Sequence, residues 1–266
     1  MPDPIPGRHD CGILARADGA SIAYRRVTPG DPETPFPTVV FLHGLLSDME
    51  GGKAVRLAEH AESAGFGYVR FDMFGHGLSS GAFADAGVGR WRDDALAVID
   101  DLTEGPLILV GSSMGGWVAL LAALARPERV RALIGIAPAP DFTTAMEAAL
   151  TAEQAAALAR GEIVHIADAE EPCGTYPVGR ALLEEGRGNL LLGGPIRFSG
   201  PVRILQGQRD ASVDWHTALA IAERLTGDDV QVALIKDGDH RLSRPQDLAL
   251  LTHTLDTLLA LPSAEA

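Results

Sequence analysis

The sequence predicts an α/β fold with a mostly parallel, eight-stranded sheet and helices on both faces. The first observation behind this prediction is a series of short, uninterrupted apolar runs, which are typical of strands buried on both faces. The second is that segments with helical spacing of apolar residues separate these runs, and strands that alternate with helices pair in parallel through crossovers. The third is the length of 266 residues, which one large domain can occupy.

Six apolar runs supply the parallel strands, at residues 38–42, 68–71, 107–110, 130–136, 202–205 and 230–235. Two alternating segments, residues 12–16 and 21–27, precede them and are separated by Asp18-Gly19, a dipeptide typical of hairpin turns. These two segments predict an antiparallel pair at one edge of the sheet and bring the number of strands to eight. The predicted helices of the core cover residues 52–64, 91–102, 117–125, 215–225 and 247–261.

Residues 138–199 interrupt this alternation. They contain helical pieces at 144–160 and 178–185, an irregular stretch at 170–177, and a Gly-rich run at 186–194. An insertion of this length between two strands predicts a small lid over the C-terminal edge of the sheet, where open α/β sheets bind their ligands. The sequence therefore divides into a core of residues 1–137 and 200–266 and a lid of residues 138–199.

The chain is acidic, with a net charge of −14. Because an acidic surface repels nucleic acid and anionic membranes, neither is expected as a partner. Solubility explains the charge, and a specific cationic partner is the alternative. No apolar run approaches the roughly 20 residues that span a bilayer, so no membrane insertion is expected. In the absence of any sign of assembly, a monomer is expected.

Cysteine usage and the N-terminal segment indicate the compartment. Cys11 and Cys173 are the two cysteines, and neither belongs to a CxxC or Cys/His cluster. Two thiols in a reducing compartment are favoured over a single disulfide. The first ten residues lack the apolar segment of a secretory signal, so the cytoplasm is the expected location. The use of 20 Arg against 2 Lys, with abundant Ala, suggests a GC-rich bacterial genome.

The most informative stretch is Gly111-Ser112-Ser113-Met114-Gly115, a GxSxG pattern that lies between a buried strand and an Ala/Leu-rich helix. A sharp turn from strand to helix forces its central residue into a strained conformation, and the residues two positions away must be small. The turn presents the Ser113 hydroxyl above the sheet. Ser112 fails as the nucleophile because glycines would be needed at positions 110 and 114, which are Val and Met. The pattern predicts Ser113 as a nucleophile.

A nucleophilic serine needs a histidine base, and the histidine needs a carboxylate to orient it. In folds with this nucleophile turn the acid and then the histidine follow the serine, each on a loop after a strand. Asp210 follows the strand at 202–205, and His240 follows the strand at 230–235. Asp214 is the main competitor for the acid, and we interpret it as the N-cap of the next helix.

The remaining histidines are unsuitable as the base. Four of them precede the serine, and three lie in the lid or on predicted helices: His9, His43, His60, His76, His165, His216 and His253. We interpret His43, which begins the loop at 43–46, as structural. Asp237 and Asp239 lie close to His240 in the chain and could tune it.

Acyl transfer also requires two backbone N–H groups that bind the oxyanion. Met114, which follows the nucleophile, supplies one, and Leu45 in the loop after the strand at 38–42 supplies the other. The Gly-rich loop at 71–79 lacks the lysine of a P-loop and the dinucleotide pattern, so it is interpreted as structural. No Cys/His/carboxylate cluster has metal-ligand spacing, and neither a metal nor a cofactor is expected.

Together these segments resemble the α/β-hydrolase family over almost the whole chain. The segments that carry the resemblance are HGLLSD, RFDMFGHGLSSG, GRWRDDALAVIDDL, VGSSMGGW, QGQRD and KDGDHRL. More narrowly, the chain is similar to bacterial relatives of the mitochondrial palmitoyl-protein thioesterase also described as an acyl-glucuronide esterase. The resemblance implies Ser113, Asp210 and His240 as the catalytic triad, and thioester or activated-ester hydrolysis as the activity.

The leading hypothesis is therefore a serine hydrolase that cleaves acyl thioesters or carboxylic esters of an acylated or small-molecule substrate. A general carboxylesterase acting on small or medium acyl esters is the first alternative, and a non-catalytic binding protein of the same fold is the second. In the lid, Arg180 and Arg187 either contact an anionic group of the substrate or belong to a solvated face. Five leucines of the lid either line an acyl pocket or form plain core: Leu182, Leu183, Leu190, Leu191 and Leu192.

Overall fold

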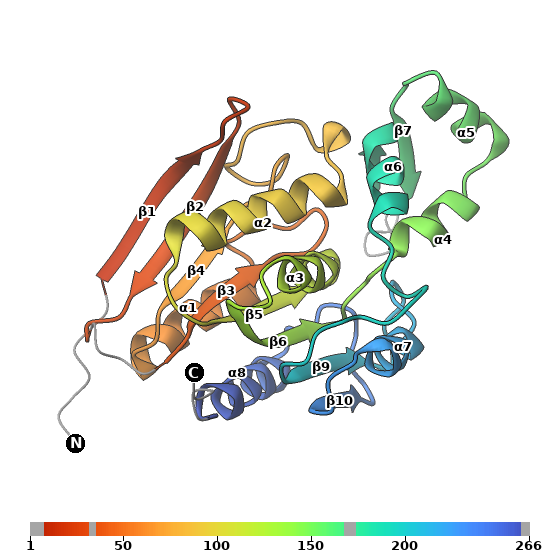
Figure 1. The fold of residues 1–266 in the computed structure, drawn as a ribbon. Helices are drawn as coiled ribbons and strands as arrows, with labels where there is room; N and C mark the ends of the chain where they lie inside the picture. Colours follow the sequence, from red (N-terminus) through yellow and green to blue (C-terminus); the bar gives the residue numbers. More distant parts are fainter. Residues whose placement is uncertain (1–7, 32–35, 168–173, 262–266) are drawn as a thin grey trace.

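The computed structural model describes residues 8–31, 36–167 and 174–261 and contains the predicted eight-stranded sheet (Figure 1). The strands lie in the order β1-β2-β4-β3-β5-β6-β9-β10. Their bounds are β1 Arg8–Ala15, β2 Ser21–Thr28, β3 Thr38–Leu42, β4 Tyr68–Phe71, β5 Leu107–Ser112, β6 Val130–Ile136, β9 Val202–Gly207 and β10 Val230–Ile235. The pairs β1–β2 and β2–β4 are antiparallel, and all other neighbours are parallel. The predicted fold class is confirmed.

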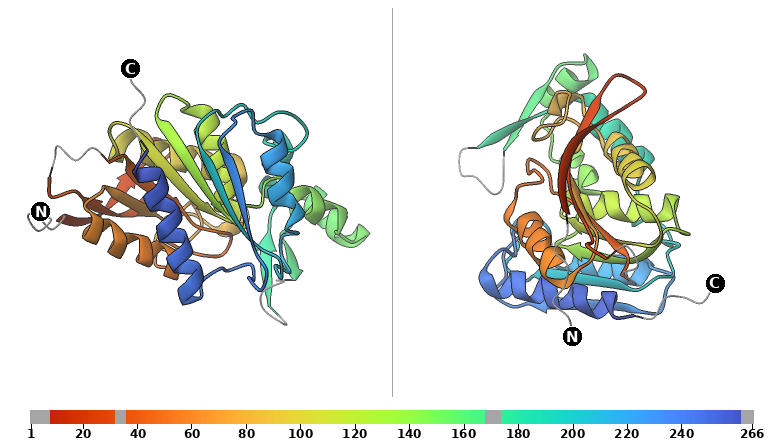
Figure 2. Two further views of the ribbon diagram at one scale, coloured as in Figure 1. Left: turned by 90° about the horizontal axis from the view of Figure 1, so that it is seen from below. Right: turned by 90° about the vertical axis from the view of Figure 1, so that its left-hand side faces the viewer.

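Helices cover both faces of the sheet. Helices α1 (Gly52–Ala64) and α8 (Pro245–Leu259) lie on one face, and α2 (Val88–Leu102), α3 (Met114–Ala125) and α7 (His216–Arg224) lie on the other (Figure 2). Side chains alternate between the two faces along a strand. In β3, Val39 and Phe41 accordingly pack under α1 and α8, while Val40 and Leu42 pack under α2 and α3.

The segment between β6 and β9 projects beyond the end of the sheet in Figure 1. It contains α4 (Phe142–Ala148), α5 (Ala152–Ala159), an antiparallel pair of β7 (Val164–Ala167) and β8 (Thr175–Val178), and α6 (Arg180–Gly188). A short 3₁₀ helix, η1 (Phe83–Asp85), packs against α6 and β8. Cys11 is exposed, and Cys173 lies outside the described residues.

Two expectations for this segment were wrong. The single helix predicted at 144–160 is two helices, because Thr151 begins a new one: its hydroxyl accepts the N–H of Gln154, and the Gln154 side chain accepts the N–H of Thr151. Of the stretch at 170–177, which was expected to be irregular, residues 170–173 lie outside the described residues and residues 175–177 belong to β8. Of the five lid leucines, Leu182 and Leu183 are buried in the core, Leu191 and Leu192 pack partly against it, and Leu190 is exposed.

Hydrogen bonds hold the two ends of this segment together. The Asp141 carboxylate, at the start of α4, accepts the backbone N–H groups of Leu191 and Leu192, both at 2.8 Å. Asp141 adopts a left-handed backbone conformation with φ of 60°. The chain therefore leaves the core and returns to it through one narrow neck.

Helix α6 also attaches directly to the core. The carboxylate of Glu185 accepts the N–H of Arg90 in the first turn of α2 at 2.9 Å. The indole N–H of Trp117 donates to the carbonyl of Asn189 at 3.0 Å. These contacts give the lid a fixed base, formed by α6, on the face that α2 and α3 cover.

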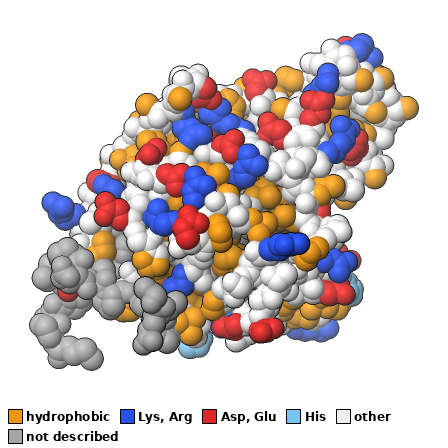
Figure 3. All heavy atoms as spheres, viewed as in Figure 1, with side chains coloured by type: hydrophobic (Ala, Val, Ile, Leu, Met, Phe, Trp, Pro, Cys, Tyr) orange, Lys and Arg blue, Asp and Glu red, His pale blue; other side chains and the backbone are white. Residues whose placement is uncertain are grey.

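The surface around α2 carries both signs of charge. Figure 3 shows Arg and acidic side chains interleaved over this face, in agreement with the ion pairs Arg92–Asp93 and Arg126–Asp100. The acidic net charge is therefore not concentrated there. Within the three described ranges, no helix is long and apolar enough to cross a membrane.

Candidate active site

The turn between β5 and α3 has the strained geometry that its sequence predicts. Ser113 adopts φ of 54° and ψ of −120°, a conformation that non-glycine residues rarely adopt. A Cβ at Gly111 would come closer than 3.0 Å to the backbone of Gly115, and a Cβ at Gly115 would come equally close to the carbonyl oxygens of Leu42 and His43. The small residues are therefore required because strand and helix touch. Helix α3 begins at Met114, three residues earlier than expected.

Three of the predicted site residues form a hydrogen-bonded chain. Ser113 Oγ lies 3.0 Å from His240 Nε2, and His240 Nδ1 lies 2.8 Å from Asp210 Oδ2. The three come from the turn after β5, the loop after β9 and the loop after β10, and all three strands end at the same edge of the sheet. The Asp210 side chain is fully buried, whereas Ser113 and His240 are partly exposed. The serine is thus reachable, and the carboxylate is shielded from water.

Asp210 is surrounded by hydrogen-bond donors. Its Oδ1 accepts the N–H groups of Ser212 at 2.9 Å and Val213 at 2.8 Å, and its Oδ2 accepts Gln206 Nε2 at 2.9 Å besides the histidine. Burial opposes ionisation, but the hydrogen bond and charge of His240 and the two backbone N–H groups outweigh it and lower the pKa of Asp210. An ionised Asp210 only accepts hydrogen bonds, so His240 Nδ1 is the donor and its Nε2 lone pair faces the serine hydroxyl.

The competitor for the acid has a different role. Asp214 is exposed, and its carboxylate accepts the backbone N–H of His216 at 3.0 Å and lies 2.7 Å from His216 Nδ1. The N-cap position itself is Trp215, one residue later than predicted, but Asp214 satisfies an N–H group at this helix end as expected. The structure brings Asp210, and not Asp214, to His240.

The loop predicted to complete an oxyanion hole lies against the serine. A Cβ built on Gly44 would be 3.3 Å from Ser113 Cβ. The N–H of Leu46 donates to His76 Nε2 and that of Ser47 to the Gly44 carbonyl. In the described part of the chain, neither the N–H of Leu45 nor that of Met114 donates a hydrogen bond. Neither of these N–H groups therefore has a partner that would compete with an oxyanion, and Gly44, next to Leu45 in the chain, lies against the serine.

Two buried histidines support this loop. His43 Nε2 accepts the N–H of Met73 at 3.0 Å while its Nδ1 donates to the Gly44 carbonyl at 2.8 Å, which agrees with its interpretation as structural. His76 receives the N–H of Leu46, and its ring lies 4.8 Å from that of His43. Burial lowers the pKa of His43 from its ordinary value of 6.5 to about 4. Burial, together with the neighbouring His43, lowers the pKa of His76 to about 4 as well.

Acidification is therefore expected to lower the free energy of unfolding through the two histidines that support the loop at 43–46. Between pH 6.5 and 4 the unfolded chain takes up protons at His43 and His76 that the folded chain does not, so stability falls as the pH falls through this window, by about 3 kcal/mol for each histidine. Urea unfolding at pH 7 and pH 5 measures the part of this loss that falls above pH 5, about 2 kcal/mol for each histidine. His76→Gln, which keeps an acceptor for Leu46, should lose less stability than the wild type over the same range. An equal loss would contradict the prediction.

The two arginines predicted to contact substrate have partners of their own. Arg180 pairs with Glu184, and Arg187 pairs with Glu147; all four side chains are substantially exposed. Within the described residues, neither arginine forms a hydrogen bond or ion pair with Ser113, His240 or Asp210. These partners favour the solvated-face alternative. In the same residues, no group of three or more His, Cys, Asp or Glu side chains could hold a metal ion.

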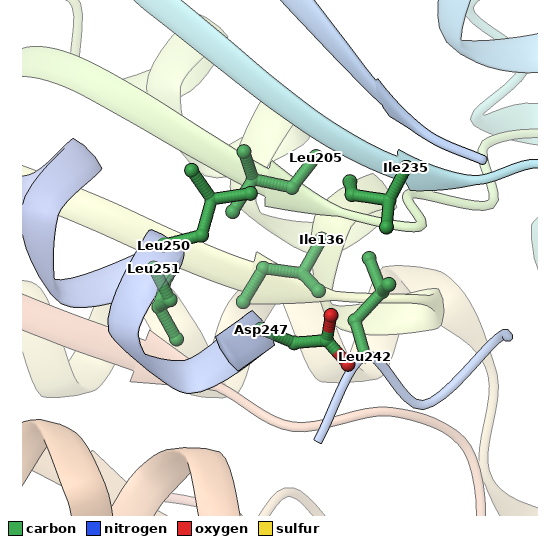
Figure 4. Close-up of a pocket in the computed structure, with 7 residues that line it drawn as sticks. All are labelled: Ile136, Leu205, Ile235, Leu242, Asp247, Leu250 and Leu251. Atoms are coloured by element: carbon green, nitrogen blue, oxygen red, sulfur yellow. The ribbon is translucent and has the colours of Figure 1, made fainter. Parts of the chain in front are cut away.

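The loop that carries His240 is anchored by contacts that the sequence did not reveal. Arg244 pairs with Asp237 at the start of the loop and with Asp247 in the first turn of α8. Between them, Leu242 adopts φ of 42° and is buried. Figure 4 shows its side chain together with six others around a small gap between the sheet and α8: Ile136, Leu205, Ile235, Asp247, Leu250 and Leu251. Asp239, expected to tune the histidine, accepts the N–H of Leu242 instead.

Comparison with known proteins agrees with this geometry. A model of the alpha/beta hydrolase fold family matches residues 37–162. The chain is 40% identical over 247 residues to palmitoyl-protein thioesterase ABHD10, mitochondrial, of Rattus norvegicus, which covers 93% of this chain and 82% of that protein. The solved structure of alpha/beta hydrolase domain-containing protein 10 from mouse has a TM-score of 0.84 at 39% identity, over 94% of this chain and 98% of that chain.

A solved structure from Agrobacterium vitis S4 has a TM-score of 0.87 at 39% identity, over 96% of this chain and 99% of that chain. The identity to these proteins extends well beyond the nucleophile turn and includes the lid, so the resemblance seen in the sequence motifs is confirmed. The chain belongs to the α/β-hydrolase family, in the group that includes ABHD10.

Proposed function

We propose that this protein is a serine hydrolase that cleaves acyl thioesters or carboxylic esters through an acyl-enzyme on Ser113. The observation that carries the proposal is the chain from Ser113 Oγ through His240 to the buried Asp210 carboxylate. The strained turn holds the hydroxyl at the edge of the sheet, and the loop that carries Leu45 packs against this turn at Gly44. This combination of nucleophile, base, orienting acid and oxyanion donors supports acyl transfer to water.

In the first half-reaction Ser113 Oγ attacks the acyl carbon while its proton passes to His240 Nε2. The carbonyl oxygen becomes an oxyanion and accepts hydrogen bonds from the N–H groups of Leu45 and Met114. When this intermediate collapses, the bond to the leaving group breaks, and the thiol or alcohol departs with the proton from His240. Asp210 stabilises the imidazolium without taking up a proton.

In the second half-reaction a water molecule enters where the leaving group was. It gives a proton to His240 Nε2 and attacks the acyl carbon, again with the oxyanion held by the two N–H groups. Collapse breaks the bond to Ser113 Oγ, which regains the proton from the histidine. The products are the free carboxylic acid and the regenerated serine, so no cofactor is needed.

Thioesters are the favoured substrates for two reasons. Sulfur donates poorly into the carbonyl and leaves well, so a thioester needs less activation than an oxyester. The relatives named palmitoyl-protein thioesterase ABHD10 share 37–41% of their residues with this chain over most of its length. The removal of a fatty acyl group from a thiol is therefore the specific reaction that we propose.

Labelling by a fluorophosphonate probe, which reacts with activated serines, tests the enzyme assignment. The folded protein is expected to be labelled at Ser113, as located by peptide mapping, and Ser113→Ala and heat-denatured protein are expected to remain unlabelled. Ser112→Ala provides the matched control, because in the described part of the chain His240 Nε2 bonds to the hydroxyl of Ser113 and not to that of Ser112, so labelling should persist. A folded wild type that no probe labels would support the non-catalytic alternative.

A second measurement addresses the leaving group. We expect kcat/KM on acyl thioesters to exceed that on oxyesters with the same acyl chain, when matched pairs of several chain lengths are compared. A preference for the oxyester at every length would replace the thioesterase assignment by that of a general carboxylesterase.

A further inference from the structure

A buried glutamine lies directly behind the carboxylate of the candidate triad. Gln206 is the fifth residue of β9 and is fully buried, with 0% of its surface exposed. Its Nε2 lies 2.9 Å from Asp210 Oδ2, and it has longer contacts to the carbonyl oxygens of Gly207 and Val213. Its Oε1 is buried without a hydrogen-bond partner among the described residues. The rest of β9 is buried as well.

The direction of the Gln206 amide follows from its neighbour. The pKa of Asp210 is lowered, so its carboxylate is ionised and accepts hydrogen bonds only. If the amide were turned over, Oε1 would face this carboxylate and two acceptors would oppose each other. The nitrogen must therefore face Asp210, which leaves Oε1 unpaired. An unpaired buried acceptor lowers stability, and an apolar side chain in this strand would avoid that loss.

Gln206 bonds to the same oxygen of Asp210 as the histidine does. Asp210 Oδ1 is held by the N–H groups of Ser212 and Val213, and Oδ2 by Gln206 and His240. Two groups therefore hydrogen-bond to Oδ2. Gln206 belongs to a strand, whereas His240 lies in a loop and its imidazole must exchange protons during the reaction. Without the amide, Oδ2 would keep the histidine as its single hydrogen-bond partner among the described residues, and the rest of the carboxylate would be held at Oδ1 alone.

We propose that Gln206 is a positioning residue: its amide holds the Asp210 carboxylate in the plane from which Oδ2 orients His240, at a cost in stability. This inference rests on the proposed function, because it gives Gln206 its role through the triad. It explains why an amide with an unpaired oxygen occupies a buried strand position.

The substitution Gln206→Leu removes the donor and keeps the approximate volume. Loss of one hydrogen bond to a charged group is expected to lower kcat/KM and the rate of fluorophosphonate labelling by about 10- to 100-fold. The melting temperature should stay the same or rise, because the unpaired Oε1 is removed with the donor. A purely structural glutamine would give the opposite pattern, in which the melting temperature falls and the labelling rate of the folded protein is unchanged.

The substitution Gln206→Glu adds a signature that depends on pH. The introduced carboxyl, when protonated, can donate to Asp210 Oδ2 as the amide does. Two carboxylates at this distance cannot both ionise, so the introduced group retains its proton to a raised pH. In the described part of the chain, the titratable groups that contact position 206 or its partner are Asp210 and His240, and the strand neighbour on β10, Leu234, is apolar.

As the pH rises, the introduced carboxyl loses the proton that makes it a donor. The Glu variant is therefore expected to come nearest to the wild-type labelling rate at the lowest pH of the series, and to lose activity relative to the wild type as the pH increases. The ratio of the Leu variant to the wild type should be the same across this range, because leucine has no proton to lose.

The experiment measures labelling rate, kcat/KM on an acyl thioester and melting temperature for the wild type and both variants from pH 6 to pH 9. Gln208→Leu is the matched control: Gln208 lies two residues along, is partly buried, and its side chain makes no hydrogen bond within the described residues. A Leu variant as active as the Gln208→Leu control would overturn the inference, as would a Glu variant whose ratio to the wild type does not vary with pH. If the wild type itself is never labelled, the proposed function fails and this inference with it, whereas a labelled wild type with an unaffected Leu variant removes the inference alone.

Discussion

Replacing Asp210 by asparagine is expected to lower kcat by about 10⁴-fold while the protein remains folded. The N–H groups of Ser212 and Val213 require an oxygen at the Oδ1 position, so the asparagine amide nitrogen must take the place of Oδ2. That nitrogen then donates to His240 Nδ1, and the histidine proton moves to Nε2, where it faces Ser113. The imidazole can no longer accept the serine proton. Gln206 can turn its amide over and accept from the asparagine, so packing is preserved.

The matched control for this prediction is Asp214→Asn. Asp214 is exposed and bonds only at the start of α7, so its substitution should leave kcat within about twofold of the wild type. Steady-state kinetics on an acyl thioester, with circular dichroism to verify folding, make the comparison. A larger loss of kcat in the Asp214 variant than in the Asp210 variant would transfer the role of the acid to Asp214.

The candidate site could be predicted because its chemistry depends on chain order and local sterics. Glycines at 111 and 115 indicate a turn in which strand and helix touch, and the structure shows that contact directly. Asp210 and His240 each follow a buried strand, and parallel strands of one sheet bring their carboxyl ends to the same edge. Sequence positions alone therefore imply that distant residues meet. The hydrogen bonds between Ser113 and His240 and between His240 and Asp210 show that they do.

The lid could not be predicted to the same extent, because its local signals compete. Residues 144–160 are rich in alanine and suit one continuous helix. The reciprocal capping hydrogen bonds between Thr151 and Gln154 begin a second helix instead. The spacing of apolar residues does not distinguish such a capping pair from two polar residues inside one helix. Strand β8 contains Pro177, which is disfavoured inside sheets, but it belongs to a two-stranded ribbon with free edges.

Contacts between side chains that the path of a turn or loop brings together were also missed. Gln206 lies in a run of strand residues, and nothing in its neighbours shows that its amide reaches Asp210. Arg244 resembles any exposed arginine before a helix, although it pairs with two aspartates on either side of the His240 loop. Both roles depend on the path of a loop, which hydrophobic periodicity does not define.

The substitution Gly115→Ala is expected to destabilise the protein by about 3 kcal/mol or more and to lower activity in whatever fraction remains folded. The added Cβ would clash with the carbonyl oxygens of Leu42 and His43, which are backbone atoms and cannot rotate away. Helix α3 would have to move away from β3. Because Leu42 and His43 lead directly into the loop that carries Leu45, the same movement would separate Ser113 from its oxyanion donor.

Gly52→Ala is the matched control, since Gly52 is an exposed residue in the first turn of α1 and an added Cβ would meet nothing within 4 Å. Alanine there should be neutral or stabilise the helix by about 0.5–1 kcal/mol. Urea unfolding gives both free energies, and the labelling rate of the folded fraction gives the effect on the site. If Gly115→Ala unfolded at the same urea concentration as the control and reacted as fast, the close contact between the turn after β5 and the loop that carries Leu45 would not be what holds the serine in place. The proposal that one steric contact couples the stability of the turn to its reactivity would then have to be abandoned.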